Sequence, residues 1–259
     1  MKNLETNIED IITSSIEEYL VKRNKVKTFH PLDHIFPKER KIRSKVGGLE
    51  TSLGKNLWER LAKKLAELNQ FEVLDENAFN KSVPKLTSEI NQIIFEFKKN
   101  RLNGDNKSIN QLFDQLRSHL TDVEIEPSSN SIQSGEGVDI YLRKNNTEYL
   151  VDIKTAQPNK KSTNSYFNTL CLWTGLYALK KSDYDLKCFI AFPYNPYEKD
   201  FWEQNLSKIP PLVPKVDAKE SDEFWDLLSG ESGTTEIIMN VFKKIGSSNF
   251  PNRFSNHFY

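Results

Sequence analysis

The stretch GEGVDIYLRKNNTEYLVDIKT, residues 135–155, predicts a β-hairpin. Apolar and polar residues alternate over residues 137–142 and again over residues 148–154, as they do along strands that have one buried face. Between them, Asn145 and Asn146 suit the positive-φ positions of a two-residue turn. With this turn, Lys144 lies opposite Thr147, and the same register places Asp139 opposite a residue of the second strand, Asp152.

This register brings two carboxylates and an ammonium group together. Side chains alternate along a strand, so Asp152 and Lys154 share one face, and Asp139 lies on the polar face of its own strand. Carboxylates on opposite residues repel each other, with Cβ atoms about 4.5–5.5 Å apart. A bound Mg²⁺ turns this repulsion into ligation and keeps positions for water and phosphate. Lys154 is then placed to hold or activate a water molecule, or to stabilise charge that grows on phosphorus.

The alternative is a solvated sheet surface, which is the usual meaning of an isolated Asp-x-Lys pattern. Three features favour a metal site here. The second strand is apolar and has the composition of a central strand, the second carboxylate falls in register, and a polar, basic segment at residues 155–161 follows the strand end.

The remaining periodicity predicts a mixed α/β core with a helical N-terminal region. Helices are expected over residues 4–25, 53–69, 84–99, 108–118, 166–180, 222–228 and 235–244, and further strands over residues 123–126 and 187–192. A polar, basic loop is expected to continue to residues 44–48, with Thr51 or Ser52 as the N-cap of the next helix. The predicted domains are a helical and basic region at residues 1–46, a catalytic core at 47–200 and a C-terminal extension at 201–259 that packs on the core or on a dimer partner.

Composition narrows the function classes. The chain has 259 residues, of which 37% are hydrophobic and 28% charged, and its formal net charge is +0. Such a neutral balance argues against non-specific coating of nucleic acid, although residues 22–45 contain nine Lys or Arg against two acids. We find no membrane span, no signal peptide, and no Walker A, GxGxxG, GxSxG or HExxH motif. Cys171 and Cys188 lie in apolar surroundings and are expected to be buried thiols, which fits a cytoplasmic protein.

The acids and lysine of the hairpin resemble the PD-(D/E)xK nuclease superfamily. Asp139 matches its first acid, and Asp152-Ile153-Lys154 matches its second motif, while Val138 stands where the motif has proline. Two further stretches are similar to type II restriction endonucleases. One is DIKTAQPN at residues 152–159, and the other is the Gly-rich entry to a helix at residues 40–58, followed by Glu59. The expected fold is therefore a restriction-endonuclease-like mixed β-sheet flanked by helices.

The resemblance implies a role for each site residue. Asp139, Asp152 and the backbone carbonyl of Ile153 would hold Mg²⁺, Lys154 would position the attacking water, and Glu59 would support the metal site. Glu50 and Glu136 are rival acids. The expected DNA contacts are Arg40, Arg43, Ser44, Thr155, Gln157 and Asn159.

The implied activity is hydrolysis of double-stranded DNA at a short, palindromic site by a homodimer, alongside a DNA methyltransferase of matching specificity. Two alternatives stay open at this point. One is a repair or junction-resolving nuclease with the same core, and the other is a non-catalytic nucleic-acid-binding protein whose acids lie on an ordinary surface.

Overall fold

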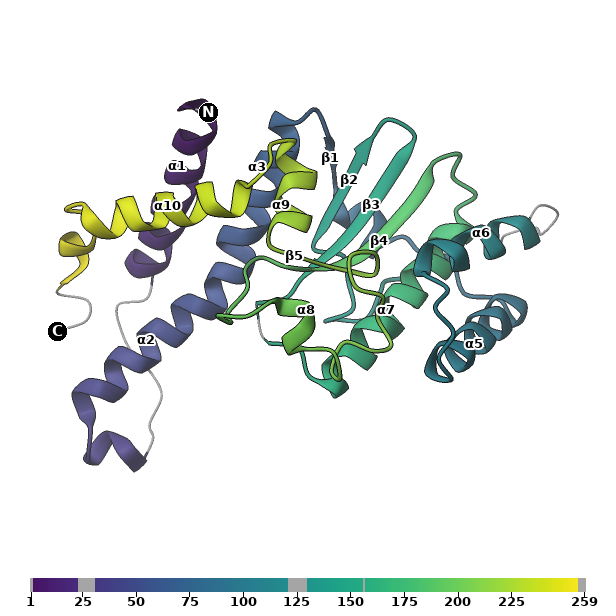
Figure 1. The fold of residues 1–259 in the computed structure, drawn as a ribbon, viewed down its shortest axis with the longest axis horizontal. Coiled ribbons are helices and arrows are strands. Elements are labelled where there is room, and N and C mark those ends of the chain that lie inside the picture. Colours follow the sequence, from purple (N-terminus) through teal and green to yellow (C-terminus); the bar gives the residue numbers. More distant parts are fainter. Residues whose placement is uncertain (1, 23–30, 121–129, 156, 256–259) are drawn as a thin grey trace. The chain divides into compact units, whose positions relative to one another are not determined.

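The computed structural model describes the whole chain except residues 1, 23–30, 121–129, 156 and 256–259 (Figure 1). The chain forms two compact units. One comprises Met1–Leu65 with Glu231–Tyr259, and the other comprises Ala66–Gly230. The domain boundaries expected from the sequence stay a prediction.

The first unit is helical. Its elements are α1 (Lys2–Lys22), the 3-10 turn η1 (Pro31–His34), α2 (Pro37–Leu53), the π-helical segment η2 (Gly54–Glu59), the start of α3 (Arg60–Leu68), α10 (Thr234–Ser247) and η3 (Pro251–Phe254). Leu57 and Leu61 are fully buried, and Trp58 packs its ring against Phe242 of α10. A second cluster joins Tyr19 and Leu20 of α1 to Phe254. Phe254 of η3 therefore packs against α1 within this unit.

The prediction of a loop at residues 44–48 is wrong, because these residues lie inside α2. Pro37 occupies the first turn of this helix, where its missing N–H is not needed. The helix then continues through Gly47 and past Thr51 and Ser52, so neither of the latter is an N-cap. Glycine in a helix interior costs only about 1 kcal/mol relative to alanine, which a helix of this length tolerates.

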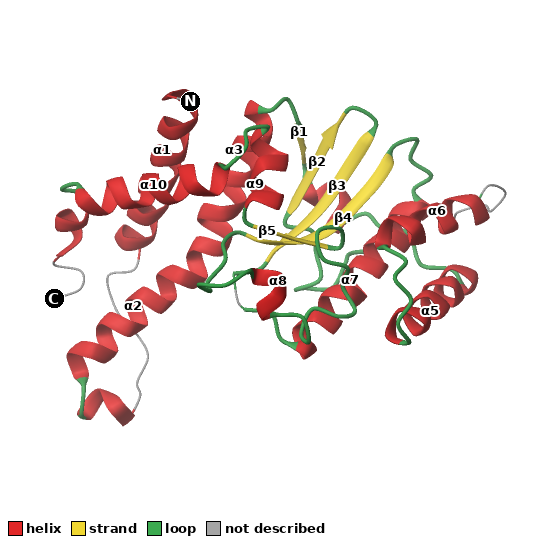
Figure 2. Ribbon diagram, viewed as in Figure 1, coloured by secondary structure: helices red, strands yellow, loops and turns green. Residues whose placement is uncertain are grey.

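The second unit contains a five-stranded sheet in the order β1-β2-β3-β4-β5 (Figure 2). Its strands are β1 (Glu72–Leu74), β2 (Ile140–Lys144), β3 (Thr147–Ile153), β4 (Asp185–Phe192) and β5 (Ala218–Glu220). The pairs β1–β2 and β2–β3 are antiparallel, whereas β3–β4 and β4–β5 are parallel. The predicted mixed sheet is therefore confirmed. The strand expected at residues 123–126 lies outside the described residues.

Helices cover both faces of this sheet. The elements are α4 (Glu76–Asn80), α5 (Ser88–Leu102), α6 (Ile109–His119), α7 (Lys160–Leu179), α8 (Phe201–Gln204) and α9 (Asp222–Ser229). Helices α5, α6 and α7 pack in one core with the β3 and β4 side chains of Leu150 and Cys188. On the other face, Phe189 of β4 meets Phe224 of α9 at 6.3 Å between ring centroids. The sheet is thus a helix-covered layer, and Cys171 and Cys188 are buried free thiols as expected.

Local contacts explain how α7 is fixed. Its N-cap is Asn159, whose side-chain oxygen accepts the backbone N–H groups of Lys161 and Ser162 at 3.1 and 3.0 Å. Gly175 permits close packing against α5, because a Cβ there would lie 2.6 Å from Ile94 Cδ1. The start of α7, directly after β3, is therefore held in place beside the strand end.

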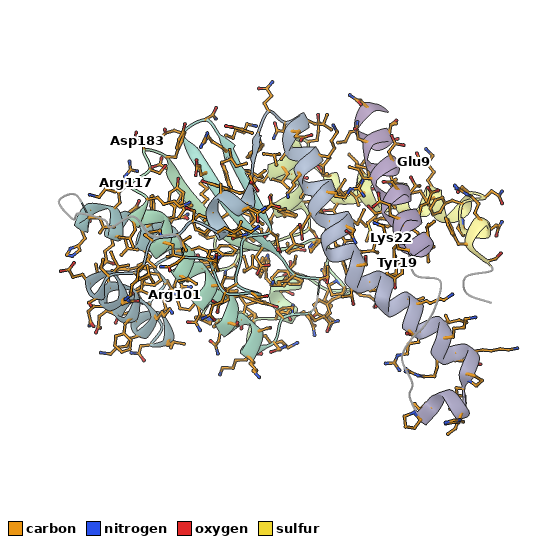
Figure 3. All side chains as sticks on the ribbon, turned by 180° about the vertical axis from the view of Figure 1, so that it is seen from behind. Glu9, Tyr19, Lys22, Arg101, Arg117 and Asp183 are labelled. Carbon is orange, nitrogen blue, oxygen red and sulfur yellow. The ribbon has the colours of Figure 1, made fainter. Side chains whose placement is uncertain are left out.

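A buried ion pair ties α5 to the β5 side of the sheet. Arg101 (Figure 3) donates to the Asp217 carboxylate at 2.9 Å, and that carboxylate also accepts the N–H groups of Ile109 and Val213 at 3.0 Å each. Burial raises the pKa of Asp217, while these hydrogen bonds and Arg101 oppose the rise.

None of the described helices is both long enough and apolar enough to cross a membrane.

Candidate active site

The hairpin of β2 and β3 has the register that the sequence predicts. Lys144 pairs with Thr147, and Ile140 pairs with Val151. Asn145 has a φ of +53°, as the first turn position requires, whereas its neighbour Asn146 does not adopt a positive φ. The turn therefore uses one left-handed residue rather than two.

The pairing changes at Asp139, one residue before β2. Its N–H donates to the carbonyl of Val151 at 3.1 Å, although Val151 is already the partner of Ile140. Two residues of one strand thus face one residue of the other, which is the pairing of a β-bulge. The expectation that Asp139 faces Asp152 directly is therefore wrong. Instead, Asp139 Oδ2 accepts the N–H of Ile153 at 3.0 Å, so the carboxylate caps the end of β3.

Asp152 is a buried carboxylate with a second carboxylate beside it. It is only 4% exposed, and it lies on the face of β3 that α7 covers. Burial raises its pKa well above the usual value, and hydrogen bonding to Asp139 raises it further, while Lys154 acts in the opposite direction. The ionised form of Asp152 is therefore unfavourable in this site unless positive charge is nearby.

Lys154 supplies one positive charge. Its Nζ donates to Asp152 Oδ1 at 2.6 Å, and its side chain is 28% exposed. Burial lowers the pKa of Lys154, but the Asp152 and Asp139 charges outweigh burial, so the pKa is raised overall. The backbone N–H of Lys154 donates to Ala191 at 2.9 Å and continues the sheet beyond β3. Asp139, Asp152 and Lys154 therefore meet at one place, at the carboxyl end of β3.

Tyr166 of α7 also borders this site. It is half-buried on α7, and its ring centroid lies 5.6 Å from Lys154 Nζ. The sequence carries no signal for this contact, because it depends on how α7 crosses the strand end.

The oxygen atoms at the end of β3 suit a hard divalent cation. A strand residue directs its N–H and C=O to the same neighbouring strand, so the Ile153 carbonyl is directed to the side on which its N–H meets Asp139. Two carboxylates and one carbonyl are oxygen ligands of the kind that Mg²⁺ takes, and they leave positions for water and phosphate. The described residues contain no cluster of three or more His, Cys, Asp or Glu with metal-binding geometry. Any metal here would depend on this small set.

The other predicted site residues are spread over both units. Glu59 is half-buried at the end of η2 in the helical unit, and its role stays a prediction. The rival Glu50 is exposed on α2, and the backbone carbonyl of Glu136 accepts Trp173 Nε1 at 2.7 Å. Among the expected DNA contacts, Thr155, Gln157 and Asn159 are exposed after β3, and Asn159 also caps α7. The other three, Arg40, Arg43 and Ser44, lie on α2.

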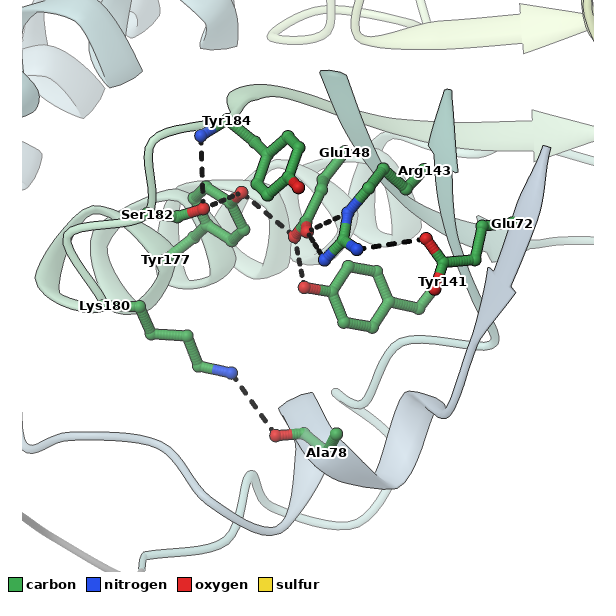
Figure 4. A network of polar contacts seen from close by, with 9 residues as sticks. All are labelled: Glu72, Ala78, Tyr141, Arg143, Glu148, Tyr177, Lys180, Ser182 and Tyr184. Atoms are coloured by element: carbon green, nitrogen blue, oxygen red, sulfur yellow. Dashed lines mark hydrogen bonds and ion pairs between the residues drawn. The ribbon is translucent and has the colours of Figure 1, made fainter. Parts of the chain in front are cut away.

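A separate polar network holds the hairpin at the opposite end of β3 (Figure 4). Glu148 is 2% exposed and accepts hydrogen bonds from the hydroxyls of Tyr141 and Tyr177 and from Arg143, whose Nε lies 2.9 Å away. Arg143 also pairs with Glu72 of β1 at 3.0 Å. Burial and the nearby carboxylate raise the pKa of Tyr141. This network links three strands and α7, and so fixes the strand that carries Asp152.

Comparison with known proteins identifies the family of the chain. The family model described as "Type II restriction endonuclease, HinfI" matches residues 1–246. The curated type II restriction enzyme MjaII of Methanocaldococcus jannaschii is 21% identical over 217 residues, which is 80% of this chain and 55% of that enzyme. The chain therefore spans about half the length of this relative. No solved structure gives a significant match. Since the family model covers nearly the whole sequence, the chain belongs to the HinfI family of type II restriction endonucleases.

Proposed function

We propose that this protein hydrolyses phosphodiester bonds in double-stranded DNA at a short specific site, with Mg²⁺ bound at the end of β3. The observation that carries the proposal is the buried Asp152 carboxylate, which shares its site with Asp139 and has Lys154 Nζ 2.6 Å away. A solvated sheet surface would not bury one acid against another. Membership of the HinfI family supports DNA as the substrate.

Asp139, Asp152 and the Ile153 carbonyl would hold the ion. When bound, Mg²⁺ polarises a phosphate oxygen and lowers the pKa of a bound water. Lys154 keeps a positive charge beside the carboxylates, where it can hold the attacking water and stabilise the charge that grows on phosphorus. Glu59 is proposed to support this site. We further propose that residues after β3 and on α2 contact the DNA, namely Thr155, Gln157, Asn159, Arg40, Arg43 and Ser44.

Two copies of the chain would cut the two strands of a palindromic site most simply, with one active site for each strand. We therefore propose a homodimer that acts on DNA in the cytoplasm and is paired functionally with a methyltransferase of matching specificity. Type II restriction membership favours this assignment over a repair or junction-resolving nuclease.

Digestion of a sequenced plasmid tests the proposal. The wild-type protein with Mg²⁺ should give discrete fragments, and EDTA should prevent cutting. Asp152→Ala and Lys154→Ala should abolish cleavage while DNA binding persists. Asp114→Ala, which removes an exposed acid on α6, is the matched control and should cut normally. Structure-dependent nicking without discrete fragments would instead indicate a junction-resolving nuclease, and unchanged cleavage by Asp152→Ala would refute the site.

A further inference from the structure

Helix α2 has two chemically different faces. Successive residues of an α-helix are turned by about 100°, so positions three and four apart lie on one side. Arg40, Arg43, Ser44, Gly47 and Thr51 follow this spacing and form one face, called here the Arg40–Thr51 face. The face was not visible from the sequence, because a loop was expected at residues 44–48.

The other side of α2 packs within the helical unit. Leu49 contacts the cluster of Tyr19, Leu20 and Phe254, and the hydroxyl of Tyr19 donates to the carbonyl of Lys45 at 3.2 Å. Lys45 and Leu49 lie roughly opposite the Arg40–Thr51 face on the helix. These contacts therefore set which side of α2 is turned inward, and they leave the Arg40–Thr51 face pointing away from that cluster.

Gly47 has no packing partner that explains it. It lies inside α2, where glycine costs about 1 kcal/mol relative to alanine. Within the described part of the chain, and apart from its two neighbours and the backbone of α2 itself, no atom lies within 4 Å of the place where a Cβ would stand. Gly54, on the same side at the helix end, is equally open. A glycine of this kind allows a second molecule to approach the helix backbone closely.

The charges of α2 indicate the chemistry of that molecule. Two of the five cations of the helix, Arg40 and Arg43, lie on the Arg40–Thr51 face, whereas Lys38 and Lys45 lie on the opposite side, Lys41 lies between, and the acids Glu39 and Glu50 border the face beside Arg43. Arg43 is exposed and has no ion-pair partner among the described residues. Two guanidinium groups one turn apart suit a polyanion with closely spaced phosphates, and α-helices fit the major groove of DNA.

We propose that the Arg40–Thr51 face of α2 lies against double-stranded DNA, with Gly47 at the point of closest approach. Arg40 and Arg43 would contact phosphates or guanine edges. Ser44 and Thr51 would lie on either side of the point where the helix backbone comes closest to the DNA. This inference rests on the proposed function only in taking DNA as the substrate. It adds Gly47 and Thr51 to the expected contacts and gives α2 a docking orientation.

The sharpest test places a side chain at Gly47, where the helix backbone is proposed to come closest to the DNA. Fluorescent duplexes that together cover a sequenced plasmid are tested for binding by anisotropy in EDTA, and the duplex that the wild-type protein binds most tightly is used for the variants. Gly47→Gln should weaken binding at least about tenfold, the equivalent of one lost good contact. The control is Gly246→Gln, because Gly246 also lies in a helix and, outside that helix, a Cβ there would have no described neighbour within 4 Å; Gly246 is exposed, whereas Gly47 is half-buried. It should bind as the wild type does.

Folding and charge are controlled separately. Gly47→Gln should not lower the urea midpoint, since glutamine favours helix more than glycine does, so its binding loss cannot come from misfolding. Arg43→Gln should weaken binding roughly 5- to 150-fold if the arginine meets a base, or lower the salt slope by about 1 if it meets a phosphate. Lys38→Gln removes the same charge on the opposite side of α2 and should have less effect than Arg43→Gln.

Three outcomes would overturn the inference. Wild-type binding by Gly47→Gln would do so, as would equal losses in Gly47→Gln and Gly246→Gln. A change in sedimentation mass for Gly47→Gln would show instead that the face joins two copies of the chain. Failure of the proposed function is distinct, because a wild-type protein that binds the duplex but never cuts with Mg²⁺ would leave this docking test intact.

Discussion

Replacing Asp139 by asparagine separates the electrostatic cost of the carboxylate pair from its use in binding metal. In Asp139→Asn the side-chain oxygen can still accept the N–H of Ile153, which lies 3.0 Å from Asp139 Oδ2. The bulge before β2 should therefore persist. The change removes one negative charge beside the buried Asp152, and with it one proposed ligand of Mg²⁺.

The magnitude follows from the charges in the site. Two unit charges about 4 Å apart interact by about 4 kcal/mol at an effective dielectric constant of about 20. Lys154 lies 2.6 Å from Asp152 and also attracts the charge of Asp139, so it offsets most of this repulsion. We expect the free energy of unfolding of metal-free Asp139→Asn to exceed that of the wild type by about 1 kcal/mol. For a chain of this size that corresponds to a Tm about 2–4 °C higher.

Thermal unfolding in EDTA and in Mg²⁺ measures both effects. A tenfold excess of Mg²⁺ over its Kd should stabilise the wild-type protein by about 1.4 kcal/mol, and this gain should disappear in Asp139→Asn. The variant should thus be the more stable protein in EDTA and the less stable one in Mg²⁺, and it should not cut DNA. A variant that is less stable than the wild type in EDTA, or that gains as much from Mg²⁺, would refute the reasoning.

Three further predictions concern neighbouring groups. The pKa of Asp152 is higher in the folded than in the unfolded protein. The contribution of Asp152 to the stability of the metal-free protein is therefore complete below the unfolded pKa of about 3.9 and is lost as pH rises through the folded pKa. Urea titrations at several pH values should show this loss in the wild type and not in Asp152→Asn. Glu148→Gln should lower the free energy of unfolding by about 2–3 kcal/mol at an unchanged m-value, because Glu148 is buried. Glu72→Gln, at the exposed end of the same network, should lower it by less than about 1 kcal/mol, and equal losses in the two variants would contradict this assignment. Tyr166→Phe keeps the ring beside Lys154 and should cleave plasmid at the wild-type rate, whereas Tyr166→Leu should be about 2–5-fold slower; equal rates for both variants would remove Tyr166 from the site.

The hairpin was predictable because its signals are local. Alternation fixes the faces of residues 137–142 and 148–154, and the Asn145–Asn146 pair fixes the turn, so the register from Ile140 to Lys144 follows. The bulge was not predictable, because it depends on the Asp139 carboxylate taking the N–H of Ile153. The alternation of apolar and polar residues therefore predicts which acidic side chains lie close together, but not the bulged strand pairing that places them there.

Longer-range features escaped the sequence for physical reasons. Strands β1 and β5 have three residues each, too few for any periodicity, and they exist because β2 and β4 offer them partners. The Glu148 network joins residues far apart in the chain, such as Tyr177 and Glu72. Glycine and polar residues dominate residues 44–48 and predict a loop there, although Pro37 is a favoured first-turn residue and the segment is helical in α2.

The account depends most on Asp139, Asp152 and the Ile153 carbonyl holding one ion at the end of β3. Anomalous diffraction from crystals of the protein grown with Mn²⁺, a substitute that takes the same oxygen ligands, measures this directly. We predict a peak bounded by these three groups, with Lys154 Nζ close by, and its loss in Asp139→Asn. A peak on other acids, or none at this position in well-diffracting crystals, would contradict the account.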